Sequence, residues 1–271
     1  MKKYLVIGNP IEHSLSPKLH NYWIKQNNID AVYNKQQLNE NDIEGIIAEV
    51  KNGKIDGINV TVPFKKLVIP FLDKLTPLAN ETHSVNTIYK ENENVADVIV
   101  GDNTDVGGFK QSLEYINYNV KNKKVFILGA GGVVPSILKA LEKLEAAKVY
   151  ISNRTKEKAK DLESYYKTSL DLETLDWGQS PDFDMIINAT SLGLKNDDEI
   201  KLNYDDIGPN KLFYDVIYNP SKTNFLLKGE KLGNQTTNGK MMFIYQAQLA
   251  FKTWHNVLPK IDNKVIKLLD P

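Results

Sequence analysis

The sequence has 271 residues, of which 41% are hydrophobic and 25% are charged, and its 34 basic residues balance 34 acidic ones. This composition is typical of a globular protein, and the length suffices for one large or two modest domains. Without an excess of lysine and arginine, there is no general electrostatic attraction to nucleic acid or to anionic membranes. We therefore expect a small-molecule substrate, with no nucleic-acid or membrane partner.

Cysteine is absent, which excludes disulfide bonds, thiolate nucleophiles and sulfur-ligated metals and suits a reducing compartment. The four histidines lack zinc-binding spacing, so we expect no metal and interpret each as hydrogen-bonded or exposed. The longest apolar run, 125–138, is too short to span a bilayer, and the N-terminus lacks the apolar region of a signal peptide. These features predict a cytoplasmic protein and leave its oligomeric state open.

The first part of the chain alternates strand and helix patterns, which is typical of α/β architecture. Two strand patterns, VNTIYKE and VADVIVG, follow each other across a short polar turn, so we expect a hairpin there and a mixed first sheet. The other elements predicted here are strands at 3–8, 32–38 and 55–60 and helices from about 17, at 42–52 and between 64 and 83.

A second domain is expected after a helix that starts at residue 105 and ends near 117. KKVFILGAGGVV predicts a buried strand that enters a glycine turn and then a helix. The apolar segment NGKMMFIYQAQLAF predicts a buried helix that returns to the first domain. Further strands are expected within 148–153, 183–190 and 211–218, and a helix at 155–166.

The glycine turn is the first candidate binding site. Gly129, Ala130, Gly131 and Gly132 stand between a strand and a helix, where glycines let the backbone approach a pyrophosphate and the helix N-terminus offers free N–H groups. The motif departs from the dinucleotide pattern at Val134, and Pro135 falls in the first helical turn. The alternative is a tight turn that binds nothing.

The next strand ends in Asn153, Arg154 and Thr155, at the point where an NAD enzyme usually places an acidic residue on the ribose. An arginine without a neighbouring carboxylate suits a 2′-phosphate, so this segment favours NADP(H) over NAD as cofactor. The alternative is that Thr155 caps the next helix and Arg154 is a solvated charge.

Polar residues gather at element ends in the first domain. Ser16 before Pro17 is interpreted first as a helix N-cap, whereas Ser14 is not explained by capping, and two hydroxyls beside a helix N-terminus could hold a carboxylate. Asn59 and Thr61 follow a strand. Such groups suit a small substrate that carries hydroxyls and a carboxylate.

Lys65 and Asp105 are the candidate reactive pair. We expect Lys65 in a first helical turn, where the positive end of the helix dipole disfavours an ammonium and could help it release a proton. Lys66 serves as its control. Asp105 opens a helix, where an acidic residue also has an ordinary stabilising role. Asn86, in SVNTIY, adds an amide at the end of another element.

Nine motifs follow one another along residues 7–251: GNPIEHSLSPKLHN, NVTVPFK, AxxxxxVNT at 79–87, DNTDVGGF, GAGG, NRTKEKA, NATSLG, DVIYNPSKT and NGxxMxxxQA. In order and spacing they resemble the motifs of the shikimate dehydrogenase family. The departures from the family pattern are Val134 and Pro135 in the glycine turn, and Lys240 with Met241 where the family commonly has leucine and glycine.

The resemblance implies residue roles, which we carry over position by position. Lys65 and Asp105 are implied as the catalytic pair. The implied shikimate-binding residues are Ser14, Ser16, Asn59, Thr61, Asn86, Tyr218 and Gln246, and the implied NADP-binding residues are Gly129, Ala130, Gly131, Gly132, Asn153, Arg154, Thr155, Thr190 and Gly239.

The resemblance also implies a fold and a reaction. The fold is an N-terminal mixed-sheet α/β substrate domain, 1–102, completed by helices in 239–271, and a Rossmann NADP-binding domain, 103–238, with a cleft between them. The reaction is the reversible NADPH-dependent reduction of 3-dehydroshikimate to shikimate. Three alternatives stay open: a quinate/shikimate dehydrogenase, a non-catalytic NADP sensor, and a folate-linked dehydrogenase, which the Ser14 and Ser16 pair disfavours.

Overall fold

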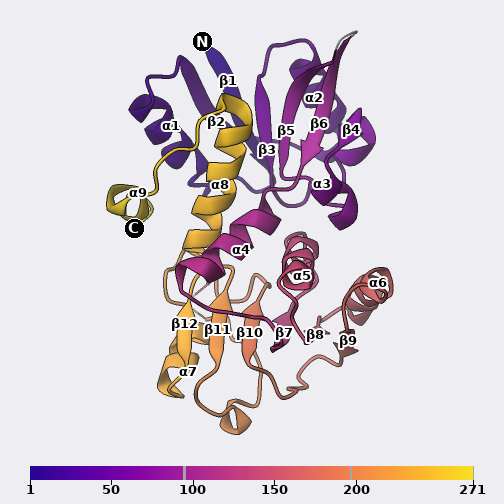
Figure 1. The fold of residues 1–271 in the computed structure, drawn as a ribbon, viewed down its shortest axis with the longest axis vertical. Coiled ribbons are helices and arrows are strands. Elements are labelled where there is room, and N and C mark those ends of the chain that lie inside the picture. The colour runs from indigo at the N-terminus through magenta and orange to yellow at the C-terminus, as the bar shows by residue number, and fades with distance from the viewer. Residues whose placement is uncertain (94–95, 196, 271) are drawn as a thin grey trace. The chain divides into compact units, whose positions relative to one another are not determined.

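The computed structural model describes residues 1–93, 96–195 and 197–270. These residues form two compact units (Figure 1): unit 1 contains Met1–Gly108 and Ile244–Asp270, and unit 2 contains Phe109–Phe243. Each unit has a six-stranded sheet covered by helices, which confirms the predicted α/β fold class. Within the described ranges, no helix is long and apolar enough to cross a membrane.

The sheet of unit 1 has the strand order β2-β1-β3-β5-β6-β4. β1 pairs in parallel with β2 and β3, whereas β5 is antiparallel to β3 and β6, so the predicted hairpin and mixed sheet are confirmed. Residues 94 and 95, within the expected turn and the start of VADVIVG, lie outside the described residues. The strands are β1 (Lys2–Gly8), β2 (Ala31–Gln37), β3 (Gly57–Val60), β4 (Lys74–Leu75), β5 (Thr87–Glu93) and β6 (Ala96–Asp102).

Alternation along these strands gives the sheet two apolar faces. Ile7 and Ile58 point to the face covered by α2, while Tyr4 and Tyr33 point to the face covered by α1 and α8. The helices of unit 1 are α1 (Ser16–Gln26), α2 (Ile43–Lys51), α3 (Pro77–Thr82) and α9 (Asn263–Leu268), with 3-10 turns at Glu40–Asp42 and Ile69–Phe71; α4 (Asp105–Tyr115) and α8 (Lys240–His255) contribute to both units.

The second of these faces contains an aromatic cluster. His20 stacks on Tyr33 with ring centroids 4.2 Å apart, and Trp254 donates its indole N–H to the carbonyl of Ile88. Neither ring nitrogen of His20 has a hydrogen-bond partner among the described residues, and burial lowers its pKa to about 3. The expectation that every histidine is hydrogen-bonded or exposed is therefore wrong for His20, because ring stacking in an apolar layer holds it as a neutral aromatic group.

The sheet of unit 2 is parallel throughout, in the order β12-β11-β10-β7-β8-β9. Counted along the chain, this is the 3-2-1-4-5-6 order of the Rossmann fold, with the change of direction between β7 and β10. Ligands of such sheets bind at the carboxyl ends of the strands beside that point. The elements are β7 (Lys124–Leu128), α5 (Val134–Lys143), β8 (Lys148–Ser152), α6 (Lys156–Tyr166), β9 (Leu172–Leu175), β10 (Met185–Asn188), a 3-10 turn (Tyr204–Asp206), β11 (Leu212–Asp215), α7 (Asn224–Lys231) and β12 (Gln235–Thr237).

Candidate active site

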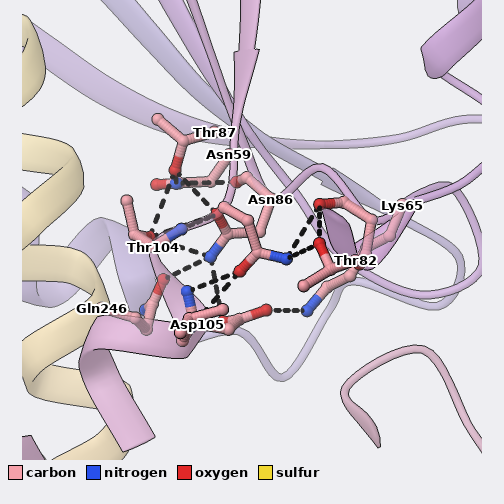
Figure 2. Close-up of polar contacts among 11 residues, drawn as sticks. Asn59, Lys65, Thr82, Asn86, Thr87, Thr104, Asp105 and Gln246 are labelled. Carbon is pink, nitrogen blue, oxygen red and sulfur yellow. Dashed lines mark hydrogen bonds and ion pairs between the residues drawn. The ribbon is translucent and has the colours of Figure 1, made fainter. Parts of the chain in front are cut away.

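A buried ion pair is the centre of the polar site in unit 1 (Figure 2). Nζ of Lys65 lies 2.5 Å from Oδ2 of Asp105, and the two residues are only 8% and 5% exposed. Removing two charges from water is expensive, and such pairs are weak contributors to stability. Their burial is better explained by chemistry, since an amine held against a carboxylate can exchange a proton with a ligand oxygen.

Asn86 fixes the other side of the carboxylate. Its Nδ2 donates to Oδ1 of Asp105 and to the hydroxyl of Thr104, both at 2.9 Å. Its Oδ1 accepts from the backbone N–H of Thr104 at 2.8 Å, which settles the orientation of the amide. Asp105 is therefore held by a lysine on one oxygen and an amide on the other, as the dashed lines in Figure 2 show.

Asn59 lies in the same network, but its donors are occupied within the protein. Its Nδ2 donates to the carbonyl of Asn86 at 3.0 Å and to the hydroxyl of Thr87 at 3.1 Å. Its Oδ1 accepts from the hydroxyl of Tyr33 at 2.7 Å. Only one lone pair of this oxygen is left for a ligand, so the position of Asn59 favours a supporting role as much as direct contact.

Gln246 reaches this network from α8. Its Oε1 accepts from Nδ2 of Asn86 at 3.3 Å, and the side chain is half-buried. Met242 and Ala250 on the same helix are buried, as the helical spacing predicts, and Leu249 is partly exposed. The expectation that Gln246 lies beside Asn86 is confirmed.

Two local predictions near this site are wrong. Lys65 lies in a series of turns that cover residues 62–68, not in the first turn of a helix, so the helix-dipole argument does not apply to it. The carbonyl of Lys65 instead accepts from the N–H of Val85 at 2.9 Å, which ties the turn to the loop before β5. Lys66 is exposed, as a control residue should be.

Ser16 is the first residue of α1, not its N-cap, which is Leu15. The hydroxyl oxygen of Ser14 accepts from the N–H of Ser16 at 3.4 Å, so Ser14 supplies the capping contact that we assigned to Ser16. Ser14 and Thr61 are partly exposed and Ser16 is 6% exposed.

In unit 2, the glycine turn follows β7 at the predicted place. Gly129 has φ of +109°, and a Cβ atom there would lie 2.7 Å from the carbonyl oxygen of Ala189, so the fold itself requires glycine. At Gly131 a Cβ atom would meet nothing nearer than 3.9 Å. The fold does not require glycine at this exposed position, which fits a backbone that a ligand approaches closely.

In the segment after β8, Arg154 and Thr155 are exposed and Asn153 is partly exposed. Asn153 accepts from the N–H of Ala130 at 3.1 Å and so links the two turns of the predicted cofactor site. Thr155 is the N-cap residue of α6, but its hydroxyl makes no capping hydrogen bond. Arg154 is exposed, takes part in none of the ion pairs of the described residues, and is the only arginine in the sequence.

The remaining predicted residues follow β10, β11 and β12. Thr190 donates through its hydroxyl to Oδ1 of Asn188 at 2.7 Å. The ring of Tyr218 lies against Phe243 with centroids 4.7 Å apart. Gly239 packs so tightly on the carbonyl of Val216 that a Cβ atom would lie 2.1 Å from its oxygen.

Sequence reasoning missed several residues that support these sites. Thr87 and Thr104 bind Asn86 through their hydroxyls, and Asn103 accepts from the N–H groups of Asp105 and Val106. Asn103 and Thr104 lie within the DNTD motif, which offered a signal for them. Thr87 offered none beyond its place after Asn86.

A Rossmann-ordered sheet with a glycine turn, in a chain that also holds a buried lysine and aspartate pair, defines the class of dinucleotide-dependent oxidoreductases. Residues 6–88 match the family model for the shikimate dehydrogenase substrate binding domain, and residues 111–195 match that for shikimate / quinate 5-dehydrogenase. The shikimate dehydrogenase (NADP(+)) of Pelagibacter ubique is 56% identical over 269 residues, which cover 99% of each chain.

Solved structures agree with these matches. The crystal structure of shikimate dehydrogenase from Aquifex aeolicus has a TM-score of 0.87 at 36% identity and covers 98% of this chain and 96% of that one. The shikimate 5-dehydrogenase of Thermus thermophilus, solved in complex with NADP(H) and shikimate, has a TM-score of 0.87 at 27% identity and covers 98% and 97%. The chain belongs to the shikimate dehydrogenase family.

Proposed function

We propose that this chain is an NADP-dependent shikimate dehydrogenase that reversibly reduces the ketone of 3-dehydroshikimate to the alcohol of shikimate, a step of aromatic amino-acid biosynthesis. The observation that carries the proposal is the buried contact of 2.5 Å between Lys65 and Asp105. In this proposal residues 1–102 and 239–271 bind the substrate, residues 103–238 bind NADP(H), and the protein works in the cytoplasm.

Lys65 is the proton-transfer residue of the proposal. Its Nζ gives a proton to the substrate oxygen during reduction and takes one back during oxidation. Asp105 accepts a hydrogen bond from Nζ and keeps the amine directed, while Asn86 prevents the carboxylate from turning. Bound NADPH supplies the hydride.

The substrate is held by hydroxyl and amide groups. Ser14, Ser16 and Thr61 offer hydroxyls for the carboxylate and ring hydroxyls, and Gln246 offers an amide beside the ion pair. Asn86 lies next to it, although both N–H groups of its amide already have partners in Asp105 and Thr104. Asn59 and Tyr218 complete the set that the family resemblance implies. A buried amide that loses its partner is costly, so a substrate without the matching hydroxyl should bind poorly.

The residues of unit 2 fit a dinucleotide with a 2′-phosphate. The proposed cradle consists of Gly129 to Gly132, together with Thr190 and Gly239 in the loops that follow β10 and β12. Arg154 would bind the 2′-phosphate between Asn153 and Thr155. The other 33 of its 34 basic residues are lysines, and a single guanidinium at this position suits the planar, bidentate binding of a phosphate.

Arg154→Ala tests the cofactor part of the proposal. Its KM for NADP should rise much more than its KM for NAD, because only NADP presents a phosphate to the guanidinium. A charge-assisted hydrogen bond contributes about 1.5–3 kcal/mol, so the ratio should change by roughly ten- to a hundredfold. Equal losses with both cofactors would contradict the assignment.

A quinate/shikimate dehydrogenase is the second candidate, because one matching family model describes both substrates. Absorbance at the NADPH band, with shikimate and quinate each tested against NADP and NAD, separates the two functions. Shikimate with NADP should give the highest kcat/KM. Folded protein that is inactive with all four pairs would favour a non-catalytic NADP sensor instead.

A further inference from the structure

Asp215 is a fully buried carboxylate that takes no part in the proposed chemistry. It is the last residue of β11, and its register partner on the neighbouring parallel strand is Asn188, the last residue of β10. The loops that leave these two strands carry Thr190 and Tyr218. Both are proposed ligand-binding residues, so Asp215 lies where the two binding loops begin.

The carboxylate of Asp215 accepts three hydrogen bonds. Its Oδ1 accepts from the backbone N–H of Ile217 and from Nδ2 of Asn188, both at 3.0 Å. Its Oδ2 accepts from the hydroxyl of Thr223 at 2.6 Å. Since Ile217 and Asn188 each direct one N–H to Oδ1, only an acceptor atom at that position pairs both of these N–H groups.

The first contact fixes the backbone that leads to Tyr218. The N–H of Ile217 donates to Asp215, and the carbonyl of Ile217 accepts from the N–H of Gly239 at 3.1 Å. The residue before Tyr218 is thus held from two sides. The close packing of Gly239 on Val216 leaves this turn little freedom to move.

The second contact fixes the loop of Thr190. Because Nδ2 of Asn188 points to Asp215, its Oδ1 is left to accept from the N–H of Thr190 at 3.1 Å and from its hydroxyl at 2.7 Å. Nδ2 also donates to the carbonyl of Leu192 at 2.9 Å. Asp215 therefore orients the amide of Asn188, and this amide in turn fixes the start of the loop at Thr190.

Burying a carboxylate costs free energy of folding, so the stability of the fold alone does not explain Asp215. Burial raises the pKa of Asp215 to about 6, although the hydrogen bonds from Thr223, Ile217 and Asn188 oppose the rise. Folding therefore favours the neutral acid over the carboxylate. The position nevertheless needs an oxygen, because the N–H groups of Ile217 and Asn188 both donate to it. A polar group retained at such a place is explained by the geometry it imposes.

We propose that Asp215 is a positioning residue of this enzyme: through Oδ1 it sets the loop of Tyr218 directly and the loop of Thr190 by way of Asn188. The inference rests on the proposed function, because it takes Tyr218 as a substrate-binding residue and Thr190 as a cofactor-binding residue. Asp215 itself touches neither ligand.

The test compares Asp215→Leu with Asp215→Asn in steady-state assays with shikimate and NADP, well below the melting temperature of each variant. Leucine removes the acceptor, so the KM values for both ligands should rise, and kcat/KM should fall by roughly ten- to a hundredfold. Asparagine keeps an oxygen for Ile217 and Asn188, so its KM values should stay within about threefold of wild type. Asp184→Leu is the control, since Asp184 accepts the backbone N–H of Lys124 at the amino ends of β10 and β7, the opposite ends of the strands from Asp215.

The control variant should lose thermal stability and keep both KM values. If Asp215→Leu behaves like Asp184→Leu, or if Asp215→Asn is as impaired as Asp215→Leu, the positioning role is wrong. Should Asp215→Leu fail to fold, Asp215→Ala is measured with the same two outcomes. A wild-type chain without shikimate activity would contradict the proposed function instead, so the two failures are distinguishable.

Discussion

At the scale of single residues, the site of unit 1 depends on donor and acceptor matching. Asp105 can only accept, and it is met by an ammonium on one oxygen and an amide N–H on the other. Asn86 is in turn oriented by a backbone N–H, which cannot change its role. The direction of the hydrogen bond from Asn86 to Asp105 is therefore set by groups that have no alternative.

Lys65→Ala should lower kcat by at least about a hundredfold if Lys65 transfers the proton, because general acid-base catalysis commonly contributes 10²- to 10⁴-fold. Lys66→Ala should leave kcat nearly unchanged, since Lys66 is exposed and next to it in sequence. The assay is shikimate oxidation followed at the NADPH band. Similar losses in the two variants would contradict the role of Lys65.

Gln246→Ala should raise the KM for shikimate and leave the KM for NADP unchanged, because the lost amide faces Asn86 in unit 1. Gln248→Ala is a matched control two positions further along α8. Its Nε2 donates to the carbonyl of Pro259 at 2.6 Å, so its loss should lower the melting temperature and spare both KM values. If Gln246→Ala shows only the behaviour expected of Gln248→Ala, its substrate role is wrong.

At the scale of elements, the start of α4 positions Asp105. Asn103 is 1% exposed and accepts from the N–H groups of Asp105 and Val106, while its own amide donates to Thr82 at 2.9 Å and to the carbonyl of Ser84 at 2.8 Å. One side chain thus both caps the helix and fixes it to the preceding loop. These contacts also fix the position of Asp105, the first residue of the helix.

Asn103→Ala should destabilise the protein by about 0.5–2 kcal/mol, as is usual when a side chain that caps the N–H groups of a first helical turn is lost, and should also lower kcat because Asp105 is less firmly held. Asp262→Ala is the control: Asp262 caps α9 by accepting from Lys264 and Val265, both at 2.9 Å. It should lose similar stability without any loss of kcat. Denaturant unfolding and shikimate assays measure the two effects, and an unchanged kcat in Asn103→Ala would argue against positioning.

The sequence predicted elements best where hydrophobic periodicity was strong. The helix from residue 105, the strand before the glycine turn and the apolar helix that contains Gln246 were all predicted, since their apolar residues face a packed layer. The segment around Lys65 was predicted wrongly as helical, because its turns are set by contacts with residues distant in sequence, such as that of Lys65 with Val85 in the loop before β5. Short strands such as β4 were missed, because two residues carry no periodic signal.

At the scale of the whole molecule, the sequence predicted a mixed sheet followed by a parallel one, but the strand order needed the structure. The order of unit 2 brings the ends of β7 and β10 together, so that the carbonyl of Ala189 limits Gly129. Likewise, Asp215 and Asn188 become partners only through strand pairing. Asn188 and Asp215 are 27 residues apart in the sequence, so no local sequence pattern could predict their contact.

The same buried carboxylate should make the stability of the whole chain depend on pH. The pKa of Asp215 is raised from 3.8 to about 6, with burial as the main cause, so folding favours the neutral acid. The stability it contributes is full below about pH 3.8 and is lost as pH rises through about 6. Tyr204 and Tyr214, whose pKa values the charge of Asp215 helps to raise, do not titrate in that range.

Asp215→Asn removes this titration and nearly preserves the shape of the side chain. The free energy of unfolding of wild type relative to Asp215→Asn should therefore fall by up to about 3 kcal/mol between about pH 4 and about pH 7.5, since each unit of pKa shift corresponds to about 1.4 kcal/mol. Urea unfolding of both proteins at matched pH values measures the difference and cancels the other carboxyl groups. A difference that does not change with pH would show that the carboxyl of Asp215 titrates alike in the folded and unfolded chain, and the raised pKa would then be wrong.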